Sequence, residues 1–284
     1  MLDVKPRKIL VGIGQLDDLD GVLEFAAAEA VRRQCGVHLM HALSVGSPHG
    51  DGSELTISGN TMQHAGTGVL VTAAQQLEEL LTDDLSVTTE LVHDGAASAI
   101  NEASPHACLV LLQRRPHTGI THGVRSVING VAGRAAVPVV VVPSTWRLEA
   151  ERPAVVVVGV GDAQISGPLV GTARDMAEEV GAGLRMVHSR AEGRRPGAGS
   201  DESAEVADLQ HAFAPLLTDH ADLHVEWLVE HGAPEDTLIA AGETASLVVI
   251  GRHHRKHALG PHLGSTARAV LARASCPVMV VEPD

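Results

Sequence analysis

The residues best suited to chemistry lie near the end of the chain, where an apolar run ends at Gly251 and a helical pattern begins after Gly264. Ser265 and Thr266 follow directly, so two hydroxyl groups stand at the predicted start of the helix. The first backbone N–H groups of a helix lack intrahelical partners and lie at the positive end of its dipole. A strand that leads through a glycine loop into a helix is therefore typical of a phosphate site. The alternative is that Ser265 only caps the helix.

The loop between these glycines is basic and rich in histidine. Arg252, Arg255 and Lys256 can each meet a phosphate group. The histidines suggest a metal site, but the loop contains no Cys, Asp or Glu to complete one, so a solvated basic loop is the better interpretation. The histidines of this loop are His253, His254, His257 and His262.

Catalytic motifs are missing from the sequence. It contains no GxSxG elbow, no GxxxxGK[ST] loop and no HExxH helix. Because a glycine loop alone does not make an enzyme, we expect binding without a defined turnover reaction. A weak ATPase stays open, and its base would have to come from Asp162, His231 or His254.

An internal repeat organises the elements that must position these residues. Five segments of the first half recur in the same order in the second, beginning with 8–14 and 155–161 and ending with 137–143 and 276–283. Each half alternates apolar runs with helical spacing, which predicts a parallel sheet with helices on both faces. The predicted strands lie near 8–13, 37–43, 85–92, 108–112 and 138–142, and near 154–159, 183–188, 223–229, 246–250 and 277–281.

The predicted fold class is α/β, with two tandem doubly wound parallel sheets of five strands each, Rossmann-like. The domains are expected at 1–145 and 152–284, joined by a linker at 143–153. Helices are expected at 20–34, with Asp20 as the N-cap, and at 67–82, after a mobile excursion over 44–66. Ligands of such sheets bind at the carboxyl ends of the strands, where the strand order reverses.

Composition narrows the function classes. The chain carries two Trp, two Phe, no Tyr and a net charge of −14, which disfavours binding of single-stranded nucleic acid. No apolar run approaches the roughly 20 residues that span a bilayer, and no signal-peptide pattern is seen, so we expect a cytoplasmic protein. The cysteines Cys35, Cys108 and Cys276 are interpreted as small buried hydrophobic residues in a reducing compartment.

The stretch from Gly251 to Gly264-Ser265 resembles the nucleotide-binding signature of the universal stress protein (UspA-like) family, a glycine, two residues, a glycine, nine residues and Gly-Ser. His254 stands at the second glycine. The family also has an aspartate after the first strand; here Gly161 occupies that position and Asp162 follows. The corresponding loop of the first half keeps only Ser126 of the signature.

The resemblance implies a tandem universal stress protein that binds an adenine nucleotide, ATP, in its second domain and acts in stress adaptation. The implied site consists of Gly161, Asp162, Ser189, Gly251, His254, Gly264, Ser265 and Thr266. The family also implies an internal pseudo-dimer, and a homodimer of two such chains is an alternative. It gives His41 and His188 a structural hydrogen-bonding role. The competing hypothesis is a module that binds no nucleotide and uses its altered loops to contact an unknown protein partner.

Overall fold

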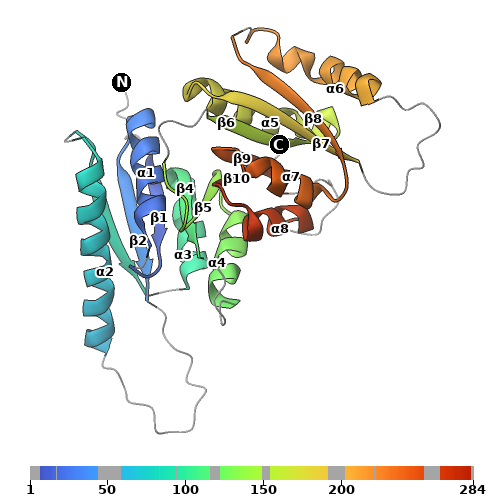
Figure 1. The fold of residues 1–284 in the computed structure, drawn as a ribbon. Helices are drawn as coiled ribbons and strands as arrows, with labels where there is room; N and C mark the ends of the chain where they lie inside the picture. Colours follow the sequence, from blue (N-terminus) through green and yellow to red (C-terminus); the bar gives the residue numbers. More distant parts are fainter. Residues whose placement is uncertain are drawn as a thin grey trace. The chain divides into compact units, whose positions relative to one another are not determined.

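The structure is a computed structural model in which the chain divides into two units, Met1–Leu148 and Glu149–Asp284. Figure 1 shows alternating strands and helices in each unit. The structure describes the whole chain except residues 1–6, 17, 44–58, 83, 94, 116–121, 149–153, 191–201, 221, 253–262 and 283–284.

The first unit is a doubly wound parallel sheet with the strand order β3-β2-β1-β4-β5. Its central strands are buried on both faces, as the continuous runs of Val, Leu and Ile predict. Its elements are β1 (Lys8–Ile13), α1 (Asp20–Arg33), β2 (Val37–Ala42), α2 (Gly59–Leu80), β3 (Val87–Val92), α3 (Ala96–Ala103), a short 3₁₀ turn (Ser104–His106), β4 (Ala107–Arg114), α4 (His122–Ala132) and β5 (Val139–Pro143).

The second unit repeats this order as β8-β7-β6-β9-β10, again with parallel pairing. The predicted fold class, two tandem α/β sheets of five strands, is confirmed. The elements are β6 (Val155–Val160), α5 (Ala163–Glu179), β7 (Gly183–Arg190), α6 (Glu202–Leu217), β8 (Val225–His231), α7 (Pro234–Gly242), β9 (Leu247–Gly251), α8 (Ser265–Arg273) and β10 (Val278–Val281).

Helix α2 begins at Gly59, so the expected excursion over 44–66 is wrong for its last eight residues. A Cβ at Gly66 would lie 2.7 Å from the Leu43 side chain and 2.8 Å from that of Leu91. The missing side chain therefore lets α2 pass close to the ends of β2 and β3. Tertiary packing of this kind overrides the weak helix propensity of glycine.

The start of the expected linker packs against α1 instead of running free. Trp146 meets Phe25 edge-on, with ring centroids 5.7 Å apart, and Arg147 forms an exposed ion pair with Asp20. The N-cap of α1 is Leu19, so the prediction that Asp20 caps this helix is wrong by one residue. The side chain of Asp20 contacts the segment after β5.

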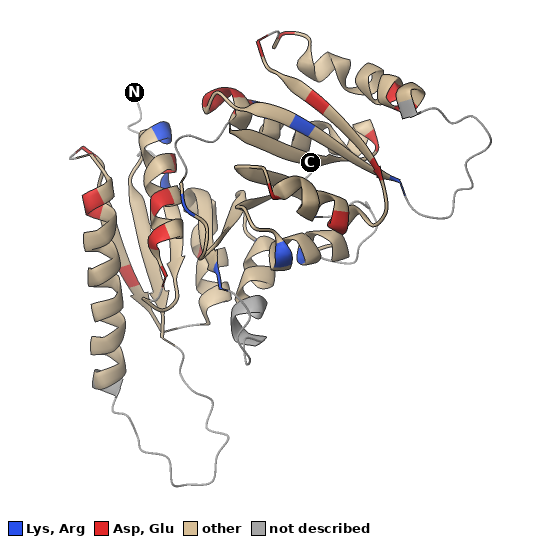
Figure 2. Ribbon diagram, viewed as in Figure 1, with Lys and Arg blue, Asp and Glu red and all other residues tan. Residues whose placement is uncertain are grey.

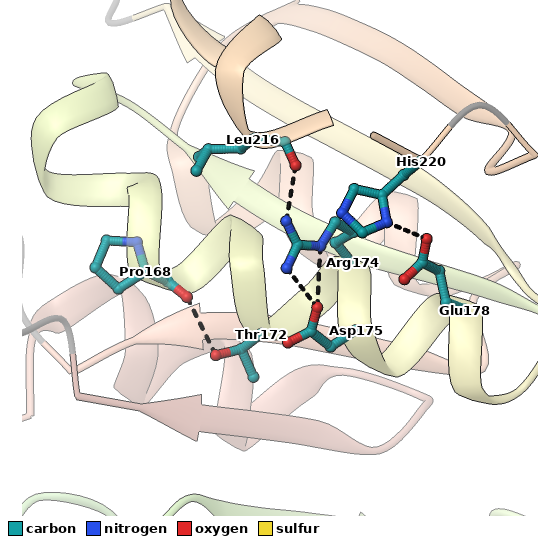
Figure 3. A network of polar contacts seen from close by, with 7 residues as sticks. All are labelled: Pro168, Thr172, Arg174, Asp175, Glu178, Leu216 and His220. Atoms are coloured by element: carbon teal, nitrogen blue, oxygen red, sulfur yellow. Dashed lines mark hydrogen bonds and ion pairs between the residues drawn. The ribbon is translucent and has the colours of Figure 1, made fainter. Parts of the chain in front are cut away.

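Polar side chains on α5 hold the end of α6 in the second unit (Figure 3). The Arg174 guanidinium donates to the Leu216 carbonyl oxygen at 2.8 Å and to the Asp175 carboxylate at 2.6 Å. One turn further along α5, Glu178 pairs with His220 just beyond α6. These contacts orient the helix that carries Glu205.

Helix α1 carries several acidic residues. Figure 2 shows acidic residues repeated along α1, where the sequence has Asp20, Glu24 and Glu29. Glu29 is buried and accepts from Arg32 and Arg33, which neutralises part of this charge within the helix. In the part of the chain that the structure describes, no helix has the length and apolar character to cross a membrane.

Candidate functional site

Each unit has one point at which its strand order reverses, and we call this the switch point. In the second unit it lies between the carboxyl ends of β6 and β9, and in the first unit between those of β1 and β4. Ligands of open α/β sheets bind there because loops diverge to either side and leave room between them. Gly161, Asp162 and Gly251 all lie at or directly after the ends of β6 and β9, so the structure brings them to the second switch point.

The second switch point opens one residue pair earlier than the first. The pairing of β6 with β9 runs through Val158 and Val249. In the first unit, β1 and β4 stay paired through Gly12 and Leu112, the equivalents of Gly159 and Ile250. The strands β6 and β9 therefore separate one residue pair earlier than β1 and β4 do.

Helix α8 begins beside this opening. Gly264 is its N-cap, with an extended backbone at φ −63° and ψ 162°, and its N–H donates to the Arg252 carbonyl oxygen at 2.8 Å. No side chain among the described residues caps this helix. Its first turn therefore presents backbone N–H groups at the positive end of the helix dipole, which is the arrangement that holds a phosphate.

Arg252 lies behind this helix start and points inward. The residue is only 4% exposed, and its guanidinium donates to the Glu282 carboxylate at 2.9 Å. Burial lowers the pKa of Arg252, while Glu282 acts in the opposite direction. The sequence suggested a direct phosphate contact for Arg252. In the structure its guanidinium is paired with Glu282, and its backbone carbonyl oxygen, not its cation, accepts from Gly264.

The loop after β6 is held by two local hydrogen bonds. Asp162 is the N-cap of α5 and accepts from the Gln164 N–H at 2.8 Å. The Gly161 N–H donates to the hydroxyl of Ser166, a buried residue that the sequence reasoning missed. Asp162 is exposed at the switch point but is committed to capping through one carboxylate oxygen.

The end of β7 carries a polar cluster that reaches across to α6. Ser189 donates to the Gly232 carbonyl oxygen at 2.7 Å, which fixes the loop after β8 where Gly232 takes a φ of +139°. Glu205 pairs with Arg190 and lies 3.4 Å from His188. Sequence reasoning missed Glu205 because α6 is distant along the chain and offers no local signal for this contact.

His188 and its counterpart His41 make the same contact in the two units. The His188 ring nitrogen Nδ1 lies 3.0 Å from the Val160 carbonyl oxygen. That of His41 lies 2.8 Å from the Ile13 carbonyl oxygen. The predicted hydrogen-bonding role of these two histidines is confirmed, because each ties the end of its strand to the end of the central strand.

The two hydroxyls at the start of α8 differ in their surroundings. Ser265 is exposed, whereas the Thr266 hydroxyl lies 3.5 Å from a Glu235 carboxylate oxygen in the first turn of α7. Ser265 is therefore the hydroxyl that faces solvent beside the backbone N–H groups. His254 and the other loop histidines lie outside the described residues, and among the described residues no group of acidic, His and Cys side chains could hold a metal ion.

The first switch point is bridged by the chain's own side chains. Arg115, just after β4, donates to the side-chain oxygen of Gln15 at 2.6 Å and to its carbonyl oxygen at 3.0 Å. Gln113 donates to the Asp18 carbonyl oxygen in the same loop. These bonds join the end of β4 and the residue after it to the loop after β1, at the first switch point.

Strand register also corrects the alignment of the two halves. The pairing of β1 with β4 matches Leu109 to Leu247, so Gln113 stands at the position of Gly251. Counting back from Pro138 and Pro277 along the sequence would instead place Leu112 there. The loop between β4 and β5 is therefore one residue shorter than its counterpart, and the first half departs further from the glycine signature.

The fold and its two switch points define a tandem protein of two doubly wound α/β domains. The family model described as the universal stress protein family matches residues 5–143 and again residues 154–282. The chain therefore belongs to the universal stress protein family, in its tandem form.

Proteins similar to this chain over nearly their whole length are also universal stress proteins. A universal stress protein of Mycolicibacterium smegmatis is 28% identical over 286 residues, covering 97% of each chain. Universal stress protein Rv2005c of Mycobacterium tuberculosis is 27% identical over 289 residues, covering 97% of this chain and 98% of the relative. The crystal structure of a universal stress protein from Archaeoglobus fulgidus has the same fold, with a TM-score of 0.69, 17% identity and 96% of both chains covered.

Proposed function

We propose that this tandem universal stress protein binds an adenine nucleotide, ATP, in its second domain and acts in stress adaptation without a defined turnover reaction. The phosphates would lie against the first turn of α8, at Gly264, Ser265 and Thr266. The adenosine would extend toward the loops that contain Gly161, Asp162 and Ser189. The observation that carries this proposal is the start of α8, which no described side chain caps, beside the place where β6 and β9 separate.

Two further features support the second domain over the first. The start of α8 is fixed in place by the buried residue Arg252, whose backbone carbonyl oxygen accepts from the Gly264 N–H at 2.8 Å. In the first domain, Arg115 and Gln113 instead bind the loop after β1. We therefore expect one nucleotide per chain.

The proposal is tested by placing a branched side chain at the helix start. A Cβ at Gly264 would lie 3.2 Å from the Arg252 carbonyl oxygen, and the two methyl groups of valine would project into the space that the phosphates need. Gly264→Val should weaken ATP binding at least about tenfold, the loss of one good charge-assisted contact. Isothermal titration of the full chain with ATP measures this.

Gly95→Val is the matched control. Gly95 is also a helix N-cap with an extended backbone, at φ −58° and ψ 127°, and a Cβ placed on it would meet no atom within 4 Å in the first unit. Both variants carry the same unfavourable residue at an N-cap, so they share the cost to helix stability. Equal affinity of the two variants for ATP would place the nucleotide elsewhere.

The competing function is a protein-interaction module that binds no nucleotide. The side-chain bridge at the first switch point favours it for the first domain. If wild-type protein shows neither heat of binding nor a thermal shift with ATP, the interaction module becomes the better account of both domains. A protein partner, the internal pseudo-dimer and a homodimer remain predictions.

A further inference from the structure

Two cysteines that are distant in the sequence face each other in the first unit. The Sγ atoms of Cys35 and Cys108 lie 3.9 Å apart, although 73 residues separate them along the chain. Cys35 lies between α1 and β2, and Cys108 is the second residue of β4. A disulfide has an S–S distance of about 2 Å, so the two sulfur atoms need to approach by only about 2 Å to bond.

A bulge in β4 brings Cys108 to this position. Lys8 pairs with Ala107 and Ile9 pairs with Leu109, so Cys108 is an extra residue between two neighbouring pairs. A β-bulge redirects the side chain of its extra residue. The Cys108 thiol therefore meets Cys35 although β1 lies between the strands β2 and β4.

The second unit shows that the fold does not need a thiol at either position. Cys35 and Ala182 are equivalent, since each N–H donates to the helix carbonyl five residues earlier and each is followed by a glycine at the start of the next strand, Gly36 just before β2 and Gly183 as the first residue of β7. In the second unit a single residue, Ser246, donates its N–H to Val155 before Leu247 pairs with Val156. In the first unit the bulge places both Ala107 and Cys108 at the equivalent position. The pair of thiols is thus a special feature of the first unit.

The two thiols differ in exposure. Cys35 is buried, and Cys108 is partly exposed. Burial raises the pKa of the Cys35 thiol to about 11, and the neighbouring Cys108 adds to the rise, while Arg33 and the Ile9 backbone oppose it. At neutral pH, Cys35 is therefore protonated and shielded, and an oxidant reaches Cys108 first.

We propose that Cys35 and Cys108 form a redox modification site that closes to an intramolecular disulfide when the protein meets a hydroperoxide. The Cys108 thiolate attacks one peroxide oxygen, which breaks the O–O bond, and protonation releases water and leaves a sulfenic acid. The Cys35 sulfur then attacks the Cys108 sulfur. The S–O bond breaks, and the Cys35 proton leaves with the hydroxyl group as a second water. Two thiols are oxidised and one hydrogen peroxide is reduced to two waters.

The disulfide would join two segments at the amino-terminal edge of the first sheet, on either side of β1. The switch points lie at the opposite, carboxyl-terminal edge of the sheets. Oxidation should therefore change the first unit without altering a nucleotide site in the second, and this proposal can fail or succeed independently of nucleotide binding. A dithiol that responds to peroxide fits a reducing compartment, where disulfides are transient.

The test is to treat the reduced full chain with stoichiometric hydrogen peroxide, alkylate the remaining thiols in denaturant, and map the digest by mass spectrometry without reduction. The expected product is one chain that has lost two hydrogens, with the peptides of Cys35 and Cys108 joined and Cys276 alkylated. Reductant should restore all three thiols. Oxidation of Cys108 to a sulfinic acid without the link, a link to Cys276, or only links between chains would each overturn the proposal.

Three variants sharpen this test. Cys35→Ala introduces the residue that the second unit carries at this position, and Cys108→Ser replaces the thiol with a hydroxyl, so each should abolish the link completely. Cys276→Ser is the matched control and should leave its yield unchanged. If Cys35→Ala forms as much intramolecular disulfide as wild type, the pairing is wrong. The wild-type peptide map decides the question even if a variant folds poorly.

Discussion

Oxidation of Cys35 and Cys108 should stabilise the first unit by a predictable amount. The bond would close a loop of 73 residues. In the chain-entropy account, a loop of this length removes unfolded-state entropy worth about 4 kcal/mol at 25 °C. Drawing the two sulfur atoms together from 3.9 Å introduces strain that reduces this gain. We expect a net stabilisation of about 2–4 kcal/mol, which moves a urea midpoint by about 1–2 M.

The chain offers a separate reporter for each unit. Its two tryptophans are Trp146, packed on Phe25 in the first unit, and Trp227, near Phe213 in the second. Replacing Trp227 with Phe leaves a fluorescence signal from the first unit alone, and Trp146→Phe leaves one from the second. Urea unfolding of oxidised and reduced protein then measures each unit by itself.

The oxidised protein should show a higher midpoint when Trp146 is the reporter and an unchanged midpoint when Trp227 is. An unchanged or lower midpoint at Trp146 would show that strain cancels the entropic gain. The same increase at both reporters would show that oxidation acts on the whole chain rather than through this loop. Either result would refute the reasoning from loop length.

Three other predictions concern pH and close packing. The pKa of Cys35 is raised from 9.0 to about 11, so the folded protein holds this proton more tightly than the unfolded chain does. The free energy of unfolding should therefore fall between pH 9 and pH 11. Urea midpoints should show this fall in the wild type and a smaller fall in Cys35→Ala. A Cβ at Gly12 would lie 2.7 Å from a Leu112 methyl, so Gly12→Ala should lower the free energy of urea unfolding by about 1–3 kcal/mol. At the equivalent Gly159 the nearest contact is 3.2 Å, so Gly159→Ala should lower it less. Gly21→Ala should lower the melting temperature because its Cβ would lie 2.5 Å from the Trp146 carbonyl oxygen. Gly171→Ala, with open space on α5, should raise it, since alanine favours a helix over glycine by up to about 1 kcal/mol. Equal effects within either glycine pair would contradict the packing argument.

The fold could be predicted from the sequence because its signals are local and repeated. Apolar runs such as 155–160 and 247–250 are long enough to mark buried parallel strands, and their recurrence fixes the tandem organisation. Helix α2 escaped prediction in its first turns, because Gly66 is typical of a loop until its packing against Leu43 and Leu91 is known.

The candidate site was only partly predictable. The start of α8 at Gly264 followed from the glycine and the hydroxyls after it, since a helix start is a local property. The inward position of Arg252 and the contact of Glu205 with His188 depend on elements far along the chain. The bulge that brings Cys108 to Cys35 is likewise a matter of strand register, which the spacing of cysteines does not encode.

The central claim, a nucleotide site in the second domain, is tested most directly by mass spectrometry of the small molecules that freshly purified protein releases on denaturation. Our account predicts one adenine nucleotide per chain from the wild type and from Gly95→Val, and clearly less than one per chain from Gly264→Val. Wild-type protein that releases no nucleotide, and whose melting temperature does not change at millimolar ATP, would contradict it.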